Sequence, residues 1–97
     1  MEATYKLYKI DIKEIGSIDL QEEITANPEV TDWEAFVFVL FDKNGYEETA
    51  RRGTVLYSPT IGRAGIEWGA GASWTDCVDE DDAMERYFEK NGKEMRN

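Results

Sequence analysis

The sequence predicts an α+β fold, in which two helices pack against a small antiparallel sheet of three to five strands. Residues 4–15 include alternating apolar and charged side chains, the period of a half-buried strand. Residues 35–41 are apolar without interruption, as in a strand covered on both faces. Two further segments, near residues 19–27 and 76–90, carry the capping and spacing signals of helices.

The chain length and composition predict one domain over residues 1–97. Ninety-seven residues leave no room for a second core, and 41% hydrophobic residues favour a packed core over disorder. Cys77 is the single cysteine, so no internal disulfide can form and a reducing cytoplasm is expected. No stretch has the length or apolarity of a membrane span or a signal peptide. We therefore expect a soluble cytoplasmic monomer that does not bind membranes.

In the first third of the chain, we expect a strand from Thr4 to Ile15 that Gly16-Ser17 ends. A short helix follows, with Asp19 as its N-cap and Glu22 three residues later in capping-box spacing. Asn27-Pro28 ends this helix, because the residue before proline avoids helical geometry.

The apolar run Ala35–Phe41 is the expected structural centre. Asn44-Gly45 follows it, and this dipeptide is a strong signal for a hairpin turn. We expect the returning strand over residues 46–51, a bend at Gly53, and a further strand over residues 54–57.

The segment from residue 60 to residue 74 is rich in glycine. We expect one short strand there, at residues 66–68, with the rest forming a loop. The acidic segment Asp76–Glu85 then leads into a helix, which Asn91-Gly92 ends.

Negative charge is concentrated in two blocks. The net charge is −10, and residues 14–34 and 67–85 each contain seven acids and no base. In the segment Asp76–Glu85, six of ten side chains are carboxylates, so a helix there would carry one charge per roughly 2–3 Å. Duplex DNA carries one charge per roughly 1.7 Å. The blocks are either solvated faces that keep the protein soluble or a surface that binds a basic partner; both readings disfavour direct nucleic-acid binding.

The sequence contains no complete catalytic or metal-binding motif. The chain has no histidine, and Cys77 lies among carboxylates that suppress its thiolate. A calcium loop counted from Asp79 requires glycine and glutamate where Met84 and Lys90 stand. A dinucleotide fingerprint begun at Gly69 lacks its third glycine. We therefore expect no enzyme activity, no metal and no cofactor.

Three tryptophans each flank an acid: Trp33, Trp68 and Trp74. Core packing is the expected role for at least two of them. Tryptophan is also enriched among interface hot spots, and Trp74, just before the acidic segment, is the best candidate for an interface anchor.

A short, histidine-free chain with a concentrated acidic helix resembles the DNA-mimic inhibitors of phages and mobile elements. Among these it resembles the anti-CRISPR proteins directed at type I-F surveillance complexes. The resemblance implies that carboxylates occupy the basic groove that normally holds target DNA in a DNA-binding protein or ribonucleoprotein complex. The main contacts would be Asp79, Glu80, Asp81, Asp82 and Glu85, extended by Asp76 and Glu89, with Glu22, Glu23, Glu29 and Asp32 as a second patch.

Two alternatives remain open from the sequence. An immunity protein that neutralises a basic nuclease toxin would present the same kind of surface. A structural or assembly component of a phage would carry the charge for solubility alone. The second of these predicts that reversing the acidic charges leaves function intact.

Overall fold

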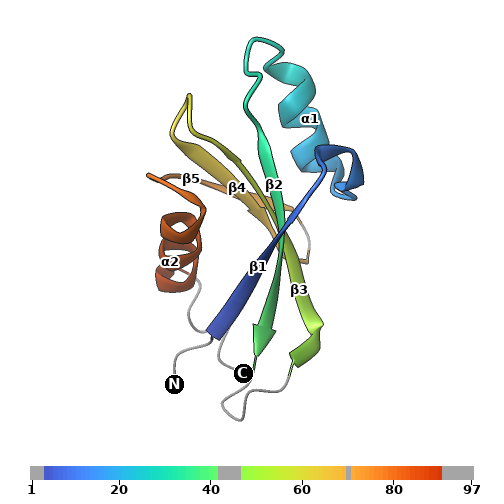
Figure 1. Cartoon of the computed structure of the whole chain (residues 1–97), viewed down its shortest axis with the longest axis vertical. Helices are drawn as coiled ribbons and strands as arrows, with labels where there is room; N and C mark the ends of the chain where they lie inside the picture. Colours follow the sequence, from blue (N-terminus) through green and yellow to red (C-terminus); the bar gives the residue numbers. More distant parts are fainter. Residues whose placement is uncertain (1–3, 42–46, 70, 91–97) are drawn as a thin grey trace.

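The computed structural model describes residues 4–41, 47–69 and 71–90 and contains one five-stranded antiparallel sheet and two helices (Figure 1). The strands lie in the order in which they occur in the chain, from β1 to β5. The α+β fold predicted from the sequence is therefore confirmed. The elements are β1 (Thr4–Ile10), a 3-10 turn (Ile12–Glu14), α1 (Ile18–Ala26), β2 (Glu34–Phe41), β3 (Glu47–Ser58), β4 (Arg63–Glu67), β5 (Ala72–Asp76) and α2 (Glu80–Lys90).

The first strand ends at Ile10, five residues before the expected end at Ile15. Asp11 explains the difference, because its carboxylate accepts the Lys13 N–H at 2.8 Å while Glu14 reaches back to the Asp11 N–H at 3.3 Å. This reciprocal pair is a capping box, and it starts the 3-10 turn in place of further strand.

Helix α1 is capped by Ser17, and the expected cap at Asp19 is wrong. The Ser17 hydroxyl accepts the Leu20 N–H at 3.2 Å, while Asp19 lies within the first turn. The helix ends at Ala26 with Asn27 as its C-cap, as the Asn27-Pro28 signal predicts. Its main core contact is Leu20, which is fully buried.

Strands β2 and β3 pair antiparallel, and β3 runs unbroken from Glu47 to Ser58. The expected bend at Gly53 is therefore wrong. Gly53 lies opposite Phe38, and a Cβ added there would overlap the Phe38 ring. The glycine makes room for a core side chain from the neighbouring strand instead of turning the chain. The predicted Asn44-Gly45 turn lies outside the described residues.

Strand β5 falls in a segment that the sequence predicts to be loop, and β4 is longer than the expected strand at residues 66–68. Trp74 of β5 lies directly opposite Gly65 of β4, and a Cβ on Gly65 would come within 2.6 Å of the indole. Gly69 and Gly71 adopt positive φ angles of 91° and 86° between the two strands. The glycines therefore build a hairpin at this edge of the sheet.

The two helices pack on opposite faces of the sheet (Figure 1). Successive strand residues point to opposite faces, and the register places Phe36 and Val55 on one face and Ala35 and Leu56 on the other. The first pair belongs to the core beneath α2, whereas the second belongs to the core that contains Leu20 of α1. We call these the α2 face and the α1 face.

Candidate functional site

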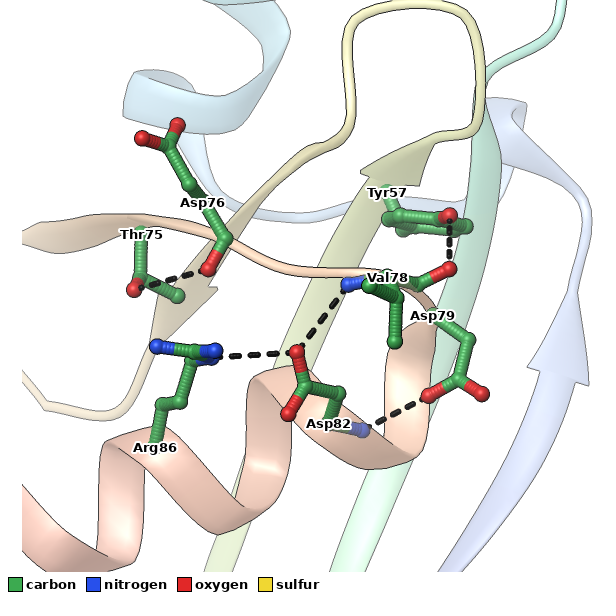
Figure 2. A network of polar contacts seen from close by, with 7 residues as sticks. All are labelled: Tyr57, Thr75, Asp76, Val78, Asp79, Asp82 and Arg86. Carbon is green, nitrogen blue, oxygen red and sulfur yellow. Dashed lines mark hydrogen bonds and ion pairs between the residues drawn. The ribbon is translucent and has the colours of Figure 1, made fainter.

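The candidate site is the N-terminal half of α2, where most of the carboxylates in the acidic segment lie. The carboxylate of Asp79 accepts the Asp82 N–H at 2.7 Å, and Asp79 O accepts the Ala83 N–H at 3.0 Å. Asp82 in turn accepts the Val78 N–H at 3.0 Å (Figure 2). These two aspartates satisfy backbone donors that a helix start would otherwise leave unpaired, so part of the acidic segment has a structural role.

Asp82 is also paired with a base of its own chain. Its Oδ2 atom accepts from Arg86 Nε at 3.0 Å, one helical turn further on (Figure 2). The bond from the Val78 N–H and then the bond from Arg86 lower the pKa of Asp82 below its usual value of 3.8. Asp82 is therefore ionised, but its charge is largely offset by the adjacent guanidinium.

Asp81 is held by a residue from the far end of the chain. Its Oδ1 atom accepts a hydrogen bond of 2.9 Å from the hydroxyl of Tyr5 in β1. The Tyr5 ring also packs against Phe88, with ring centroids 5.4 Å apart. The pKa of Tyr5 is raised, mainly by partial burial and then by Asp81, with smaller contributions from Glu85 and Asp79. The tyrosine thus remains a neutral donor and fixes α2 to the edge of the sheet.

The outward side of α2 carries a row of acids. Ala83, Met84 and Tyr87 are buried against the sheet, so the side chains on the other side of the helix face solvent. We call these outward acids the acidic ridge: Asp81, Asp82, Glu85 and Glu89.

The charge density of the acidic ridge is lower than the sequence suggests. Asp81, Glu85 and Glu89 follow one another at intervals of four residues, so each lies about 6 Å from the next along the helix axis. Arg86 lies beside them, so four carboxylates and one guanidinium leave three net charges over about 12 Å. One charge per about 4 Å is close to the roughly 3.4 Å spacing along a single DNA strand, and below that of a duplex. Glu80, which the sequence also proposes as a contact, is only partly exposed, as is Asp82 of the ridge.

Asp76 and Trp74 lie apart from the ridge, in β5. The register places both on the α1 face, with Asp76 opposite Arg63 and Trp74 opposite Gly65. The Arg63 guanidinium lies 5.2 Å from the centre of the Trp74 ring, and the indole packs at the margin of the core beneath α1. Trp74 therefore has intramolecular partners on both sides, while the Asp76 side chain is exposed.

The acids proposed as a second patch, which belong to the block at residues 14–34, do not join the acidic ridge on α2. Glu22 and Glu29 are exposed on or after α1, on the other side of the sheet from α2, and Glu23 accepts from the Asn27 side-chain amide at 3.2 Å. Asp32 is engaged in structure: it accepts from the Ser58 hydroxyl at 2.7 Å, and from the N–H and hydroxyl of Thr60 at 2.9 and 2.7 Å. These bonds lower the pKa of Asp32 below 3.8, the Thr60 hydroxyl contributing most.

The remaining residues singled out by the sequence lie in the core or pack against it. Trp33 is 9% exposed in the cluster beneath α1. Trp68 packs edge-on against Tyr87 of α2, with ring centroids 6.4 Å apart. Cys77 is buried, and burial followed by the charges of Asp82 and Asp79 raises the pKa of its thiol to about 11. The thiol is therefore a packing group at neutral pH.

Sequence reasoning missed two residues that shape the site, Tyr5 and Arg86. Arg86 was detectable, since a base four residues after Asp82 on a helix is a familiar pairing distance. Tyr5 was not, because 76 residues separate it from Asp81 and only the packing of α2 on the sheet brings them together.

Within residues 4–41, 47–69 and 71–90, no cluster of three or more cysteine or acidic side chains is arranged to hold a metal ion. Nor does any described helix have the length and apolarity needed to cross a membrane. Comparison with protein-family models, curated proteins and solved structures gives no significant match to this chain.

Proposed function

We propose that the protein is a DNA-mimic inhibitor whose acidic ridge enters the DNA-binding groove of a basic nucleic-acid-processing complex. Following the resemblance noted above, the proposed target is a type I CRISPR surveillance complex. The inhibitor would occupy lysine and arginine side chains that otherwise hold DNA phosphates. It would compete with DNA without chemistry of its own.

The observation that carries the proposal is the arrangement of Asp81, Glu85 and Glu89. They are spaced by one turn on the solvent side of a helix whose other side is buried in the core. The bond from Tyr5 and the cap at Asp79 restrain this helix at its N-terminal end. A restrained row of charges loses little conformational entropy on binding, which favours a tight complex.

The electrostatic consequence is a steep dependence on salt. Exposed charges separated by more than about 8 Å are screened at physiological ionic strength, and binding that pairs several charges weakens as salt is added. We expect the affinity for the target to fall at least tenfold between about 50 and 200 mM salt. An affinity that does not change with salt would contradict a mimic of the DNA backbone and favour apolar contacts.

The most informative mutational test reverses the charge of acids that do not cap the helix or pair with Arg86. Replacing Asp79 or Asp82 would also disturb the helix start, so a charge reversal there would be ambiguous. Glu85→Lys with Glu89→Lys changes only exposed side chains of the acidic ridge. We expect this double variant to remain folded and to lose at least about tenfold in target affinity.

The matched control is Glu22→Lys with Glu29→Lys. It changes the net charge by the same amount on exposed residues of the α1 side. Competition with fluorescently labelled target DNA for the purified surveillance complex measures both variants. Equal loss of affinity in the two double variants would show that net charge alone matters, and full retention of affinity in the ridge variant would refute the proposal.

A further inference from the structure

Strand β1 forms one of the two edges of the sheet. In the described part of the chain it pairs with β2 and with no other strand. Alternate backbone N–H and C=O groups along its seven residues therefore point away from the sheet. Such an edge is a template for another strand unless something protects it.

The side chains of β1 differ between its two faces. Tyr5, Leu7 and Lys9 lie on the α2 face, and Lys6 and Tyr8 lie on the α1 face. Tyr8 is 48% exposed, and the Lys9 side chain is 68% exposed and forms an ion pair of 3.7 Å with Glu34.

The acidic ridge determines which kind of side chain an added strand needs at the position opposite Tyr5. Tyr5 donates to Asp81 at 2.9 Å, and Glu85 is close enough to influence the same phenol. A residue directly opposite Tyr5 would lie about 5 Å away on the same face. It would therefore meet carboxylates, and a basic side chain fits that position best.

We propose that two copies of the chain associate through their β1 strands, antiparallel and about a twofold axis at Leu7. In this register Lys9 of the second copy lies opposite Tyr5 and reaches Asp81, and the reciprocal pair forms by symmetry. Lys6 lies opposite Tyr8 of the second copy on the other face. No like charges lie directly opposite each other, and Leu7 packs against Leu7 of the second copy.

The other edge strand does not meet the same requirement. β5 reads Ala-Ser-Trp-Thr-Asp and contains no basic residue, so it cannot place a cation beside Asp81. Pairing of β1 with β5 of another copy would also be head-to-tail, which produces rings or open filaments. Pairing of β1 with β1 of a second copy is symmetric, so the assembly ends at a dimer.

The net charge of −10 opposes association, so the local pairs must outweigh it. At physiological ionic strength the screening length is about 8 Å, which weakens repulsion between distant acids more than contacts at the interface. The proposed dimer replaces the expectation of a monomer drawn from the sequence. It engages Asp81, so Glu85 and Glu89 are the exposed acids of the ridge that remain for a target of the proposed function.

Sedimentation equilibrium of the purified chain tests the proposal, with Lys9→Glu and Lys13→Glu as matched variants. Both variants change the charge equally, and both lysines are exposed, but Lys13 lies in the 3-10 turn outside β1. We expect the wild type to approach twice the 11.1 kDa of one chain at high concentration. Lys9→Glu should raise the dissociation constant at least about tenfold relative to Lys13→Glu.

Leu7→Cys tests the register independently. Directly opposite Cα atoms in an antiparallel pair are about 4.5–5.5 Å apart, within the range that a disulfide spans. Buried Cys77 does not compete, so mild oxidation should give a covalent dimer, whereas Lys13→Cys should not. Three results would each overturn the proposal. They are a mass of one chain at every concentration, equal dissociation constants for the two glutamate variants, and assemblies larger than two copies.

Discussion

The hydroxyl of Tyr5, at the start of the chain, donates a hydrogen bond of 2.9 Å to Asp81, near the start of the last helix. This contact joins the edge of the sheet to the acidic ridge. It makes Asp81 a positioned charge, and it explains how an exposed row of carboxylates keeps a fixed place on the sheet.

Removing that hydroxyl should loosen α2 without unfolding the protein. We expect Tyr5→Phe to lower the free energy of unfolding by no more than about 1 kcal/mol, because the bond is exposed and Asp81 regains water. The pKa of Tyr5 is raised above 10.0, so its contribution to stability is present below pH 10 and lost as pH rises further. Urea unfolding at several alkaline pH values should show a shallower decline for Tyr5→Phe than for the wild type.

Removing Arg86 should strengthen binding to the target of the acidic ridge. Arg86→Gln releases Asp82 from its ion pair and makes the net charge of the ridge more negative, while the bond from the Val78 N–H to Asp82 stays in place. We expect a several-fold gain in affinity in the DNA-competition assay. A loss of affinity would mean that the guanidinium itself contacts the target, contrary to the mimic.

Asp32 should stabilise the protein at neutral pH and not in acid. Its pKa is lowered, so its contribution is present above pH 3.8 and disappears as pH falls through the folded-state pKa. We expect Asp32→Asn to lower the thermal midpoint at neutral pH, because the amide is a weaker acceptor for Thr60 and the fully buried Ser58. The difference from wild type should shrink as pH falls below 3.8 and through the lowered folded-state pKa. Glu22→Gln, an exposed control, should change the midpoint little at either pH.

Cys77 should be inert in the folded protein. The thiol is buried, and its pKa is raised from 9.0 to about 11. We expect iodoacetamide to modify it at neutral pH only after unfolding in urea, as measured by mass spectrometry. The same shift predicts that stability falls as pH rises from 9 towards 11, because the unfolded chain ionises first. Rapid alkylation of the native protein would show that the segment before α2 opens readily.

Gly53 should be intolerant of any side chain. A Cβ at this position overlaps the ring of Phe38, which is fully buried and has little room to move. We expect Gly53→Ala to cost about 1–3 kcal/mol in the free energy of unfolding measured with urea. Gly16→Ala is the matched control, because nothing lies within 4 Å of its added Cβ and its φ is not positive. Similar effects for the two variants would contradict the close approach of Phe38.

Some of the fold could be predicted because its signals are local. The uninterrupted apolar run at 35–41 defines β2, whose alternate residues enter two cores, and Asn27-Pro28 marks the end of α1. Two of the errors have a common cause. Gly53 and Gly65 look like turn residues in the sequence, yet both lie inside strands because the ring of Phe38 and the indole of Trp74 occupy the space above them. That space is defined by the neighbouring strand, which local spacing does not reveal.

The sequence by itself determined the class of the fold, the two acidic blocks and the position of the helix that carries one of them. These follow from composition and from periodicity within a few residues. Only the tertiary structure decided that the two helices lie on opposite sides of the sheet, that Asp32 binds Ser58 and Thr60, and that Tyr5 meets Asp81. Each depends on which face of a strand a residue occupies, and therefore on a register that pairs distant segments.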